Sequence, residues 1–236
     1  MRNMKRSEYI ESILQIYSLV GVLSKKNGSE VLHLRNKKSG KDLVLRSLPR
    51  PLAPYEKLQS VRCVNLPEIY DALNMDDGQV VLEEYIDGLT VAQVMEVDKY
   101  RSSGARKVLF GVCDALTALH SKGIVHRDVK PENVIVEKSG RVVLIDFDAS
   151  RIESASNKDT VIMGTVGYVS PEQLGLSQSD ARTDIYAAGV LYNVMLTGQH
   201  PSVIIASGKA GRIIRKCTSI NPSERFQTAS ELSSAL

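Results

Sequence analysis

The residues best suited to chemistry form one dense cluster in the middle of the chain. The run His126-Arg127-Asp128-Val129-Lys130-Pro131-Glu132-Asn133 is followed, after a predicted β-hairpin, by Asp146-Phe147-Asp148. Carboxylate and amide oxygens are the ligands that Mg²⁺ prefers. Phosphoryl transfer needs a held metal ion, an aligned acceptor hydroxyl and charge stabilisation more than it needs covalent help from protein. The cluster therefore predicts Mg²⁺-assisted phosphoryl transfer.

Each polar residue of the cluster suits one part of that reaction. Asp128 can accept the proton of the acceptor hydroxyl, and Lys130 can neutralise charge on the transferring group. Asn133 and Asp146 offer the oxygen ligands for Mg²⁺. These roles define the candidate catalytic and metal-binding residues.

The same residues resemble the HRDxKxxN catalytic loop and the metal-binding Asp-Phe pair of eukaryotic-type serine/threonine protein kinases, in a compact bacterial style. Lys130 stands where the serine/threonine branch, rather than the tyrosine branch, has its lysine. The resemblance implies an α+β, bilobal fold with ATP and Mg²⁺ as cofactors. It implies one kinase domain over residues 1–236, with a small β-rich N-lobe at about 1–86 and a larger, mainly α-helical C-lobe at about 87–236.

Further motifs follow in the order that this family implies. Gly164–Gln173 resembles the end of an activation segment, with Ser170 in place of the usual alanine, and implies that Thr165 steadies the catalytic loop. Thr183–Val190 resembles the buried helix that anchors this loop, and Asn221–Phe226 resembles the closing motif. The resemblance assigns structural or regulatory roles to His126, Arg127, Phe147, Glu172, Asp184 and Arg225. Among them, Arg225 is expected to pair with Glu172, and Arg127 with a phosphate on Ser154, Ser156 or Thr160.

The N-terminal part departs from the family pattern. When Val31 is aligned with the valine of the glycine-rich loop, Ser24, Lys26 and Ser29 replace the glycines. Arg46 then takes the place of the phosphate-binding lysine, and it keeps the charge but not the compact ammonium. Glu56 is the nearest candidate for the carboxylate that normally pairs with that lysine.

The resemblance also implies which residues contact the nucleotide. The expected ATP-binding residues are Leu23, Val31, Val44, Arg46, Glu84, Ile86, Ile135 and Asp146. The four apolar side chains other than Ile86 would enclose adenine, although a plain core position accounts for each of them as well. Glu83 falls at the position that closes the adenine slot. Asp148, where the family has glycine, either caps a turn or adds a metal ligand.

The elements that position these residues follow from hydrophobic patterning and turn residues. We expect a helix or the start of a strand over residues 8–20, a short helix from Pro54 to Val61, and helices over 105–121 and 183–196. Strands are expected at 29–34, 42–48, 79–86, 134–136 and 142–145.

Composition limits the alternatives. The chain has 236 residues, 43% of them hydrophobic, and 30 Lys and Arg against 27 Asp and Glu, spread along its length. Nucleic acid is therefore not an expected partner. The three cysteines have no paired spacing, which favours a reducing cytoplasm over a disulfide framework or zinc site. Neither a signal peptide nor a membrane-spanning segment is expected.

Three functions remain open at this point. An active kinase is favoured by the presence of Asp128, Lys130, Asn133, Asp146 and Thr165. A pseudokinase, acting as a nucleotide-binding or scaffolding module, is favoured by Arg46, the missing glycines and Asp148. A small-molecule kinase of the aminoglycoside phosphotransferase type has a similar metal motif, but the match at Gly164–Gln173 opposes it. The protein substrate is not identified, and a regulatory protein partner is left open.

Overall fold

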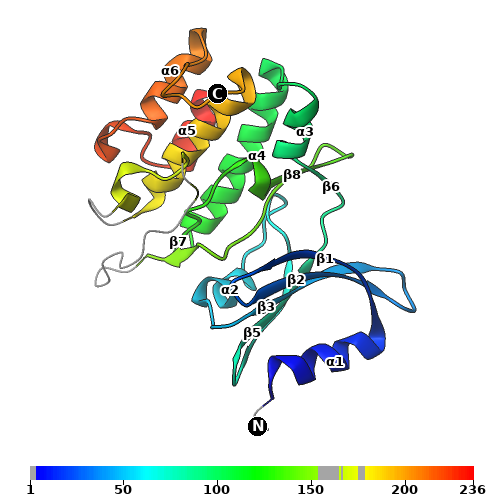
Figure 1. The fold of residues 1–236 in the computed structure, drawn as a ribbon. Coiled ribbons are helices and arrows are strands. Elements are labelled where there is room, and N and C mark those ends of the chain that lie inside the picture. The colour runs from blue at the N-terminus through cyan, green and yellow to red at the C-terminus, as the bar shows by residue number, and fades with distance from the viewer. Residues whose placement is uncertain (1–3, 154–164, 166, 175–178) are drawn as a thin grey trace. The chain divides into compact units, whose positions relative to one another are not determined.

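A computed structural model describes residues 4–153, 165, 167–174 and 179–236 and divides the chain into two compact units. The N-terminal unit consists of Met1–Val61 and Pro67–Ile86, and the C-terminal unit of Arg62–Leu66 and Asp87–Leu236. Strands dominate the first unit and helices the second (Figure 1). The α+β class, with a β-rich N-terminal part and a helical C-terminal part, is thereby confirmed.

The N-terminal unit is a five-stranded antiparallel sheet with two helices. Its strands have the order β1-β2-β3-β5-β4. The elements are α1 (Arg6–Ile16), β1 (Tyr17–Lys26), β2 (Ser29–Asn36), β3 (Asp42–Leu48), α2 (Ala53–Leu58), β4 (Ile69–Met75) and β5 (Gly78–Glu84). Residues 8–20, left open between helix and strand, contain the larger part of α1 and the start of β1. Strand β4 is not among the predicted strands.

Successive side chains of each strand point to opposite sides of the sheet, so the sheet has two different faces. The α1 face carries Leu32, Leu34, Leu43, Leu45 and Val80, against which Tyr9, Ile10, Ile13 and Leu14 of α1 pack. The Arg46 face carries the intervening residues of β2, β3 and β5, namely Val31, His33, Val44, Arg46, Val81 and Glu83. Thus α1 covers one face of the sheet, and the predicted nucleotide-binding valines and Arg46 share the other.

Local chemistry explains the turn and the short helix that flank β3. The side-chain oxygen of Asn36 accepts hydrogen bonds from the backbone N–H groups of Lys38 and Ser39 at 3.0 and 2.9 Å, which closes the turn before β3. Pro54 lies in the first turn of α2, where a missing N–H costs nothing. The turn and the proline therefore fix where β3 and α2 begin.

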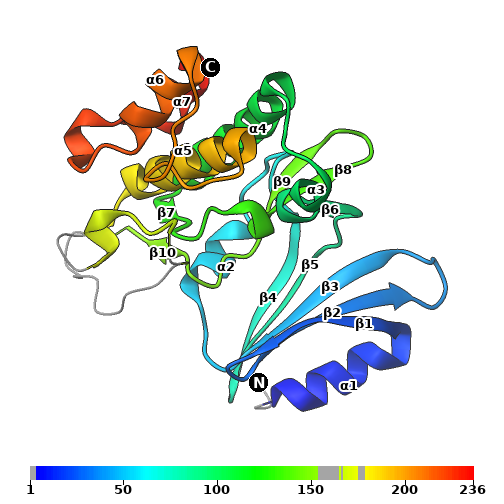
Figure 2. The same ribbon diagram turned by 45° about the horizontal axis from the view of Figure 1, so that its top comes forward.

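The C-terminal unit is built around two long helices, α4 (Ser102–His120) and α5 (Ala181–Thr197), which lie side by side (Figure 2). The other helices are α3 (Val91–Val97), α6 (Gly208–Cys217) and α7 (Ala229–Ala235), with 3₁₀ turns η1 (Pro131–Asn133), η2 (Pro171–Leu174) and η3 (Pro222–Glu224). The short strands are β6 (Gly88–Thr90), β7 (Ile124–Val125), β8 (Val134–Glu137), β9 (Val142–Leu144) and β10 (Arg151–Ile152).

Burial of α4 and α5 creates the rigid base for the loops between β7 and β9. The predicted apolar stripe of α4, Val108, Val112, Leu116 and Leu119, is fully or almost fully buried. Helix α5 is buried on most of its circumference, begins at the capping side chain of Asp180 and ends at Gly198 with φ of 74°. No helix in the described ranges is long and apolar enough to cross a membrane.

Candidate active site

The loop between β7 and η1 is anchored by one buried carboxylate. The backbone N–H groups of His126 and Arg127 donate to the two carboxylate oxygens of Asp184 at 2.9 and 2.7 Å, and His120 Nε2 lies 2.8 Å from Oδ2. The side chain of Asp184 is fully buried. Burial would raise its pKa, but the hydrogen bonds, chiefly that with His120, hold the pKa below the ordinary value. Helix α5 thereby fixes the backbone directly before Asp128.

Asp128, Lys130 and Thr165 form a closed triangle. Lys130 Nζ lies 2.7 Å from Asp128 Oδ2 and donates to Thr165 Oγ1 at 2.6 Å, while the Thr165 hydroxyl donates to Asp128 Oδ1 at 2.8 Å. Burial alone would raise the pKa of Asp128. The hydrogen bonds from Lys130 and Thr165 outweigh burial and hold the pKa of Asp128 below its ordinary value. Asp128 is therefore an ionised acceptor at neutral pH.

Asn133 is oriented by the same aspartate. Its Nδ2 donates to the Asp128 carbonyl oxygen at 2.8 Å and to Asp128 Oδ2 at 2.9 Å, so the oxygen end of the amide points the other way. The Ile145 N–H donates to the Asn133 carbonyl at 2.8 Å, which brings Asp146 beside Asn133. This pair offers the two oxygen ligands that the sequence predicts for Mg²⁺. No group of three or more His, Cys, Asp or Glu side chains suited to a metal occurs within the described residues.

Two residues of the site have strained backbones. Arg127 and Asp146 both have φ of 69°, a conformation that side chains other than glycine seldom adopt. Contacts from the surrounding fold must hold each of them there, since strain of this kind persists only where the structure enforces it. For Arg127, the hydrogen bond to Asp184 is one such contact.

Phe147 and Asp148 follow the predicted metal ligand. Phe147 is fully buried, and its ring meets the His126 ring edge-on with centroids 5.4 Å apart. Burial lowers the pKa of His126 and keeps its imidazole neutral. Asp148 stands inside a turn closed by a hydrogen bond from Ser150 N–H to the Phe147 carbonyl at 2.9 Å. This position suits the turn-capping alternative for Asp148, and the role of a metal ligand stays a prediction.

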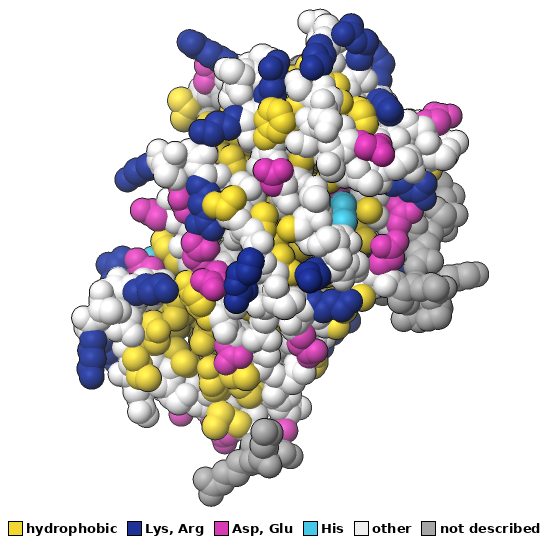
Figure 3. Space-filling view, turned by 180° about the vertical axis from the view of Figure 1, so that it is seen from behind, with side chains coloured by type: hydrophobic (Ala, Val, Ile, Leu, Met, Phe, Trp, Pro, Cys, Tyr) yellow, Lys and Arg dark blue, Asp and Glu magenta, His cyan; other side chains and the backbone are white. Residues whose placement is uncertain are grey.

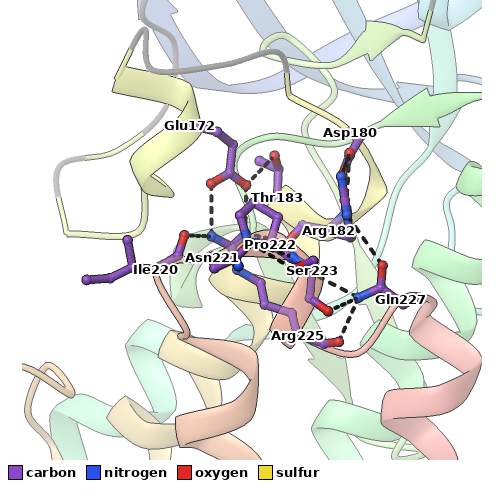
Figure 4. A network of polar contacts seen from close by, with 10 residues as sticks. All are labelled: Glu172, Asp180, Arg182, Thr183, Ile220, Asn221, Pro222, Ser223, Arg225 and Gln227. Carbon is purple, nitrogen blue, oxygen red and sulfur yellow. Dashed lines mark hydrogen bonds and ion pairs between the residues drawn. The ribbon is translucent and has the colours of Figure 1, made fainter.

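Glu172 and Arg225 form a buried bidentate ion pair (Figure 4). Arg225 Nη1 and Nη2 donate to the two Glu172 oxygens at 2.6 and 2.9 Å, and Thr183 Oγ1 donates to Oε1 at 3.0 Å. Burial would raise the pKa of Glu172, but the hydrogen bond from Arg225 holds it below the ordinary value. The pair ties η2 and η3 to the first turn of α5.

Gln173 is a residue that sequence reasoning missed. Its side-chain amide donates to the Arg127 carbonyl at 3.1 Å and its Oε1 accepts from the Ser170 backbone N–H at 3.1 Å. The glutamine thus joins η2 to the loop that carries Asp128. It follows Glu172 directly in the sequence, and only the motif context could have suggested this contact.

Arg46 has a partner that the sequence did not assign. Its Nε donates to Glu83 Oε1 at 2.6 Å, and the two residues are only 6% and 4% exposed. The expected pairing with Glu56 is wrong, because Glu56 lies on the exposed side of α2 and accepts a hydrogen bond from Asn74 Nδ2 at 2.7 Å. The buried residues of α2 are Pro54, Tyr55 and Leu58.

The other predicted nucleotide-binding residues differ in their surroundings. Val31 and Val44 are buried on the Arg46 face, whereas Leu23 is 54% exposed on the edge strand β1. The Glu84 N–H donates to the Glu68 carbonyl at 2.8 Å, so a contact of the Glu84 backbone with adenine must use its carbonyl oxygen. Ile86 is buried at the end of the N-terminal unit. Ile135 belongs to the C-terminal unit, in β8.

Several predicted positions lie outside the described residues. These are the candidate phosphorylation sites Ser154, Ser156 and Thr160, and also Gly164 and Val166 of the activation-segment motif. On the molecular face in Figure 3, Lys and Arg side chains are frequent toward the top, lie among Asp and Glu side chains across the middle, and are few in the mostly hydrophobic area at the lower left. The expectation that nucleic acid is not a partner remains a prediction.

Comparison with known proteins gives matches over most of the chain. The sequence profile of the protein kinase domain matches residues 31–236. A probable serine/threonine-protein kinase of Streptomyces coelicolor is 30% identical over 207 residues, covering 79% of this chain and 31% of the relative. The Mycolicibacterium smegmatis serine/threonine-protein kinase PknB is 27% identical over 259 aligned positions, which cover 92% of this chain and 41% of the relative. Serine/threonine-protein kinase D of Synechocystis is 30% identical over an alignment that covers 72% of this chain and 38% of the relative. The chain thus spans about a third to two-fifths of the length of these relatives.

Proposed function

This chain belongs to the protein kinase family, and we propose that it is a serine/threonine protein kinase domain that transfers the γ-phosphoryl group of Mg-ATP to protein hydroxyl groups. The observation that carries the proposal is the hydrogen-bonded set of Asp128, Lys130, Thr165 and Asn133. Its residue types and mutual distances suit a base, a charge-neutralising cation and a metal ligand in one place.

Asp128 acts on the acceptor hydroxyl in this proposal. Its lowered pKa keeps the carboxylate ionised at neutral pH, so that it can orient the hydroxyl and receive the proton. Lys130 lies 2.7 Å from Asp128 and can shift toward the transferring phosphoryl while staying near the carboxylate. Thr165 holds both side chains and limits their freedom.

Mg²⁺ fits the residues present in the C-terminal unit. The amide of Asn133 is held by its nitrogen end, so its oxygen suits a cation, and Asp146 supplies a carboxylate. Two protein ligands are typical of Mg²⁺, which keeps waters and phosphate oxygens as its other ligands. When bound, the ion would offset negative charge on the phosphates.

The names of similar proteins and the residue Lys130 support a protein as the substrate. The three relatives described above carry the name serine/threonine-protein kinase, and Lys130 matches that branch. The buried tie between Glu172 and Arg225 supports η2 as a fixed platform next to the catalytic loop. These observations favour a protein kinase over a small-molecule phosphotransferase. The cytoplasmic location and a regulatory partner stay predictions.

A pseudokinase is the second candidate. It is favoured by one specific observation, the engagement of Arg46 by Glu83 at the position where the family has a phosphate-binding lysine. A pseudokinase would bind nucleotide without transferring phosphate, so direct measurement of transfer separates the two candidates.

Mass spectrometry of the purified chain after incubation with Mg-ATP and a mixture of basic and acidic protein substrates tests the proposal. We expect phosphate on serine or threonine with the wild type and almost none with Asp128→Asn. Asp114→Asn on the exposed side of α4 is the matched control and should behave as the wild type. Equal incorporation by wild type and Asp128→Asn would contradict the proposal, and no incorporation by either would favour the pseudokinase.

A further inference from the structure

The buried pair of Arg46 and Glu83 lies in an apolar part of the sheet. Val31 and Val81 are the cross-strand partners of Arg46, and Val44 is the partner of Glu83. All three valines are at most 8% exposed. An arginine in such surroundings is costly unless a carboxylate accompanies it, because burial removes the hydration of the charge. The pair is therefore a strong local constraint on where the guanidinium lies.

Strand register, rather than a helix, creates this pair. Arg46 faces Val81 and Val44 faces Glu83 across β3 and β5, so Arg46 and Glu83 are diagonal neighbours on one face. Both strands lie inside the sheet and are hydrogen-bonded on both sides. The relative position of the two side chains is thus set by backbone pairing and does not depend on α2, where Glu56 is engaged with Asn74.

The contact also orients the arginine. Glu83 Oε1 accepts from Nε, which is the nitrogen on the stem side of the guanidinium. A carboxylate at Nε fixes the plane that carries Nη1 and Nη2, and a planar fork in a fixed orientation suits two oxygens of a phosphate. A flexible lysine would gain less from such a contact, since its ammonium is a point charge.

We propose that Glu83 is a positioning residue that holds Arg46 for the phosphates of ATP. This inference rests on the proposed function. It assigns to a strand residue the task for which the sequence offered Glu56 on a helix. The N-terminal unit then binds phosphate through a pair built entirely into its sheet, and Arg46 with Glu83, rather than Arg46 alone, replaces the familiar lysine.

An opposite role for Glu83 predicts the opposite result. If the carboxylate only neutralises Arg46 and weakens its attraction for phosphate, its removal strengthens ATP binding. If it positions Arg46, its removal weakens ATP binding. The isosteric change Glu83→Gln removes the charge and keeps the shape, so it separates the two.

Kinetics of Glu83→Gln with varied ATP form the main test. We expect the apparent KM for ATP to rise roughly 10- to 100-fold, the range given by losing a hydrogen bond to a charged group. The KM for the protein substrate should change little, because the pair concerns ATP alone. Glu56→Gln is the matched control and should leave both constants unchanged. An unchanged or lower KM for ATP in Glu83→Gln overturns the inference.

A second variant keeps the test valid if Glu83→Gln folds poorly. Replacing both members by apolar residues, Arg46→Met with Glu83→Leu, removes the buried charges together and often preserves folding. Thermal unfolding should show this double variant to be at least as stable as Glu83→Gln. We expect it to fold and yet to lose ATP affinity by at least tenfold. A folded double variant with wild-type ATP affinity would show that the pair is structural only.

Failure of the proposed function gives a different pattern. If the wild type transfers no phosphate, Mg-ATP affinity by calorimetry replaces KM, and the same loss in Glu83→Gln is expected. Wild-type transfer with an unaffected Glu83→Gln overturns the role of Glu83 and leaves the kinase proposal standing. A wild type that neither transfers phosphate nor binds ATP overturns both.

Discussion

Asp184→Asn should destabilise the protein far more than its conservative chemistry suggests. Asp184 is fully buried, and its Oδ2 accepts from the His126 N–H and lies 2.8 Å from His120 Nε2, while Oδ1 accepts from the Arg127 N–H. An asparagine has a single oxygen. If that oxygen takes the place of Oδ2, the amide NH₂ faces the Arg127 N–H, and two donors meet without an acceptor between them.

The expected cost follows from these contacts. The charge-assisted hydrogen bond to Arg127 is worth about 1.5–3 kcal/mol, and leaving its buried N–H unsatisfied adds about 1–3 kcal/mol. The two contacts at the other oxygen also lose their charge assistance. We therefore expect a loss of about 2.5–6 kcal/mol in the free energy of unfolding, a large part of the 5–15 kcal/mol typical of a domain.

Chemical denaturation with linear extrapolation measures this loss, and an unchanged slope would show that the unfolded state is not altered. Asp114→Asn, on an exposed part of α4, controls for the generic effect of the substitution. Hydrogen exchange at the His126 and Arg127 amides should increase in Asp184→Asn, since Arg127 can relax from its φ of 69°. A loss below about 1 kcal/mol, with unchanged exchange, would refute the reasoning that Asp184 anchors this loop.

Three further outcomes are expected. The lowered pKa of Glu172 means that its pair with Arg225 stabilises the fold above the unfolded pKa of about 4.3 and loses this effect as the pH falls through the folded pKa. Denaturation at several pH values should therefore show that the free energy of unfolding falls less steeply toward acidic pH in Glu172→Gln than in the wild type. Thr165→Val removes a hydrogen bond that lowers the pKa of Asp128, so the acid limb of the pH–rate profile should move to higher pH; an unmoved limb would contradict this role. Asp146→Asn should weaken nucleotide binding more with Mg²⁺ than without it in calorimetry, and equal losses would argue against a metal ligand.

The C-terminal site was predictable because its chemistry lies in contiguous motifs. Asp128, Lys130 and Asn133 belong to one short run, so a turn such as η1 is enough to bring them together. The α5 motif specifies a helix through its apolar content, and Asp184 in its first turn is buried and accepts hydrogen bonds from the His126 and Arg127 N–H groups. For such residues, a local pattern already contains most of the geometry.

The N-terminal unit was harder to predict from the sequence, because its main side-chain contacts depend on which strands pair and in which register. Helix α1 covers one face of the sheet, but residues 8–20 show only a short apolar pattern that a strand shares. Strand β4, Ile69–Met75, escaped notice because asparagine and aspartate interrupt its apolar residues. Without β4 and the register of β5, the two faces of the sheet cannot be assigned.

The two buried ion pairs differ in how far the sequence alone can predict them. Arg225 and Glu172 are far apart in sequence, yet each stands in a recognisable motif, and their pairing is predicted by the resemblance to the kinase family. Arg46 and Glu83 stand at recognisable positions too, but their pairing requires that β3 and β5 be neighbours in one specific register. A shift by one residue would turn Glu83 to the α1 face and leave Arg46 buried without it. The substitution of lysine by arginine therefore cannot be judged alone, because its consequence depends on a carboxylate that only the folded sheet places beside it.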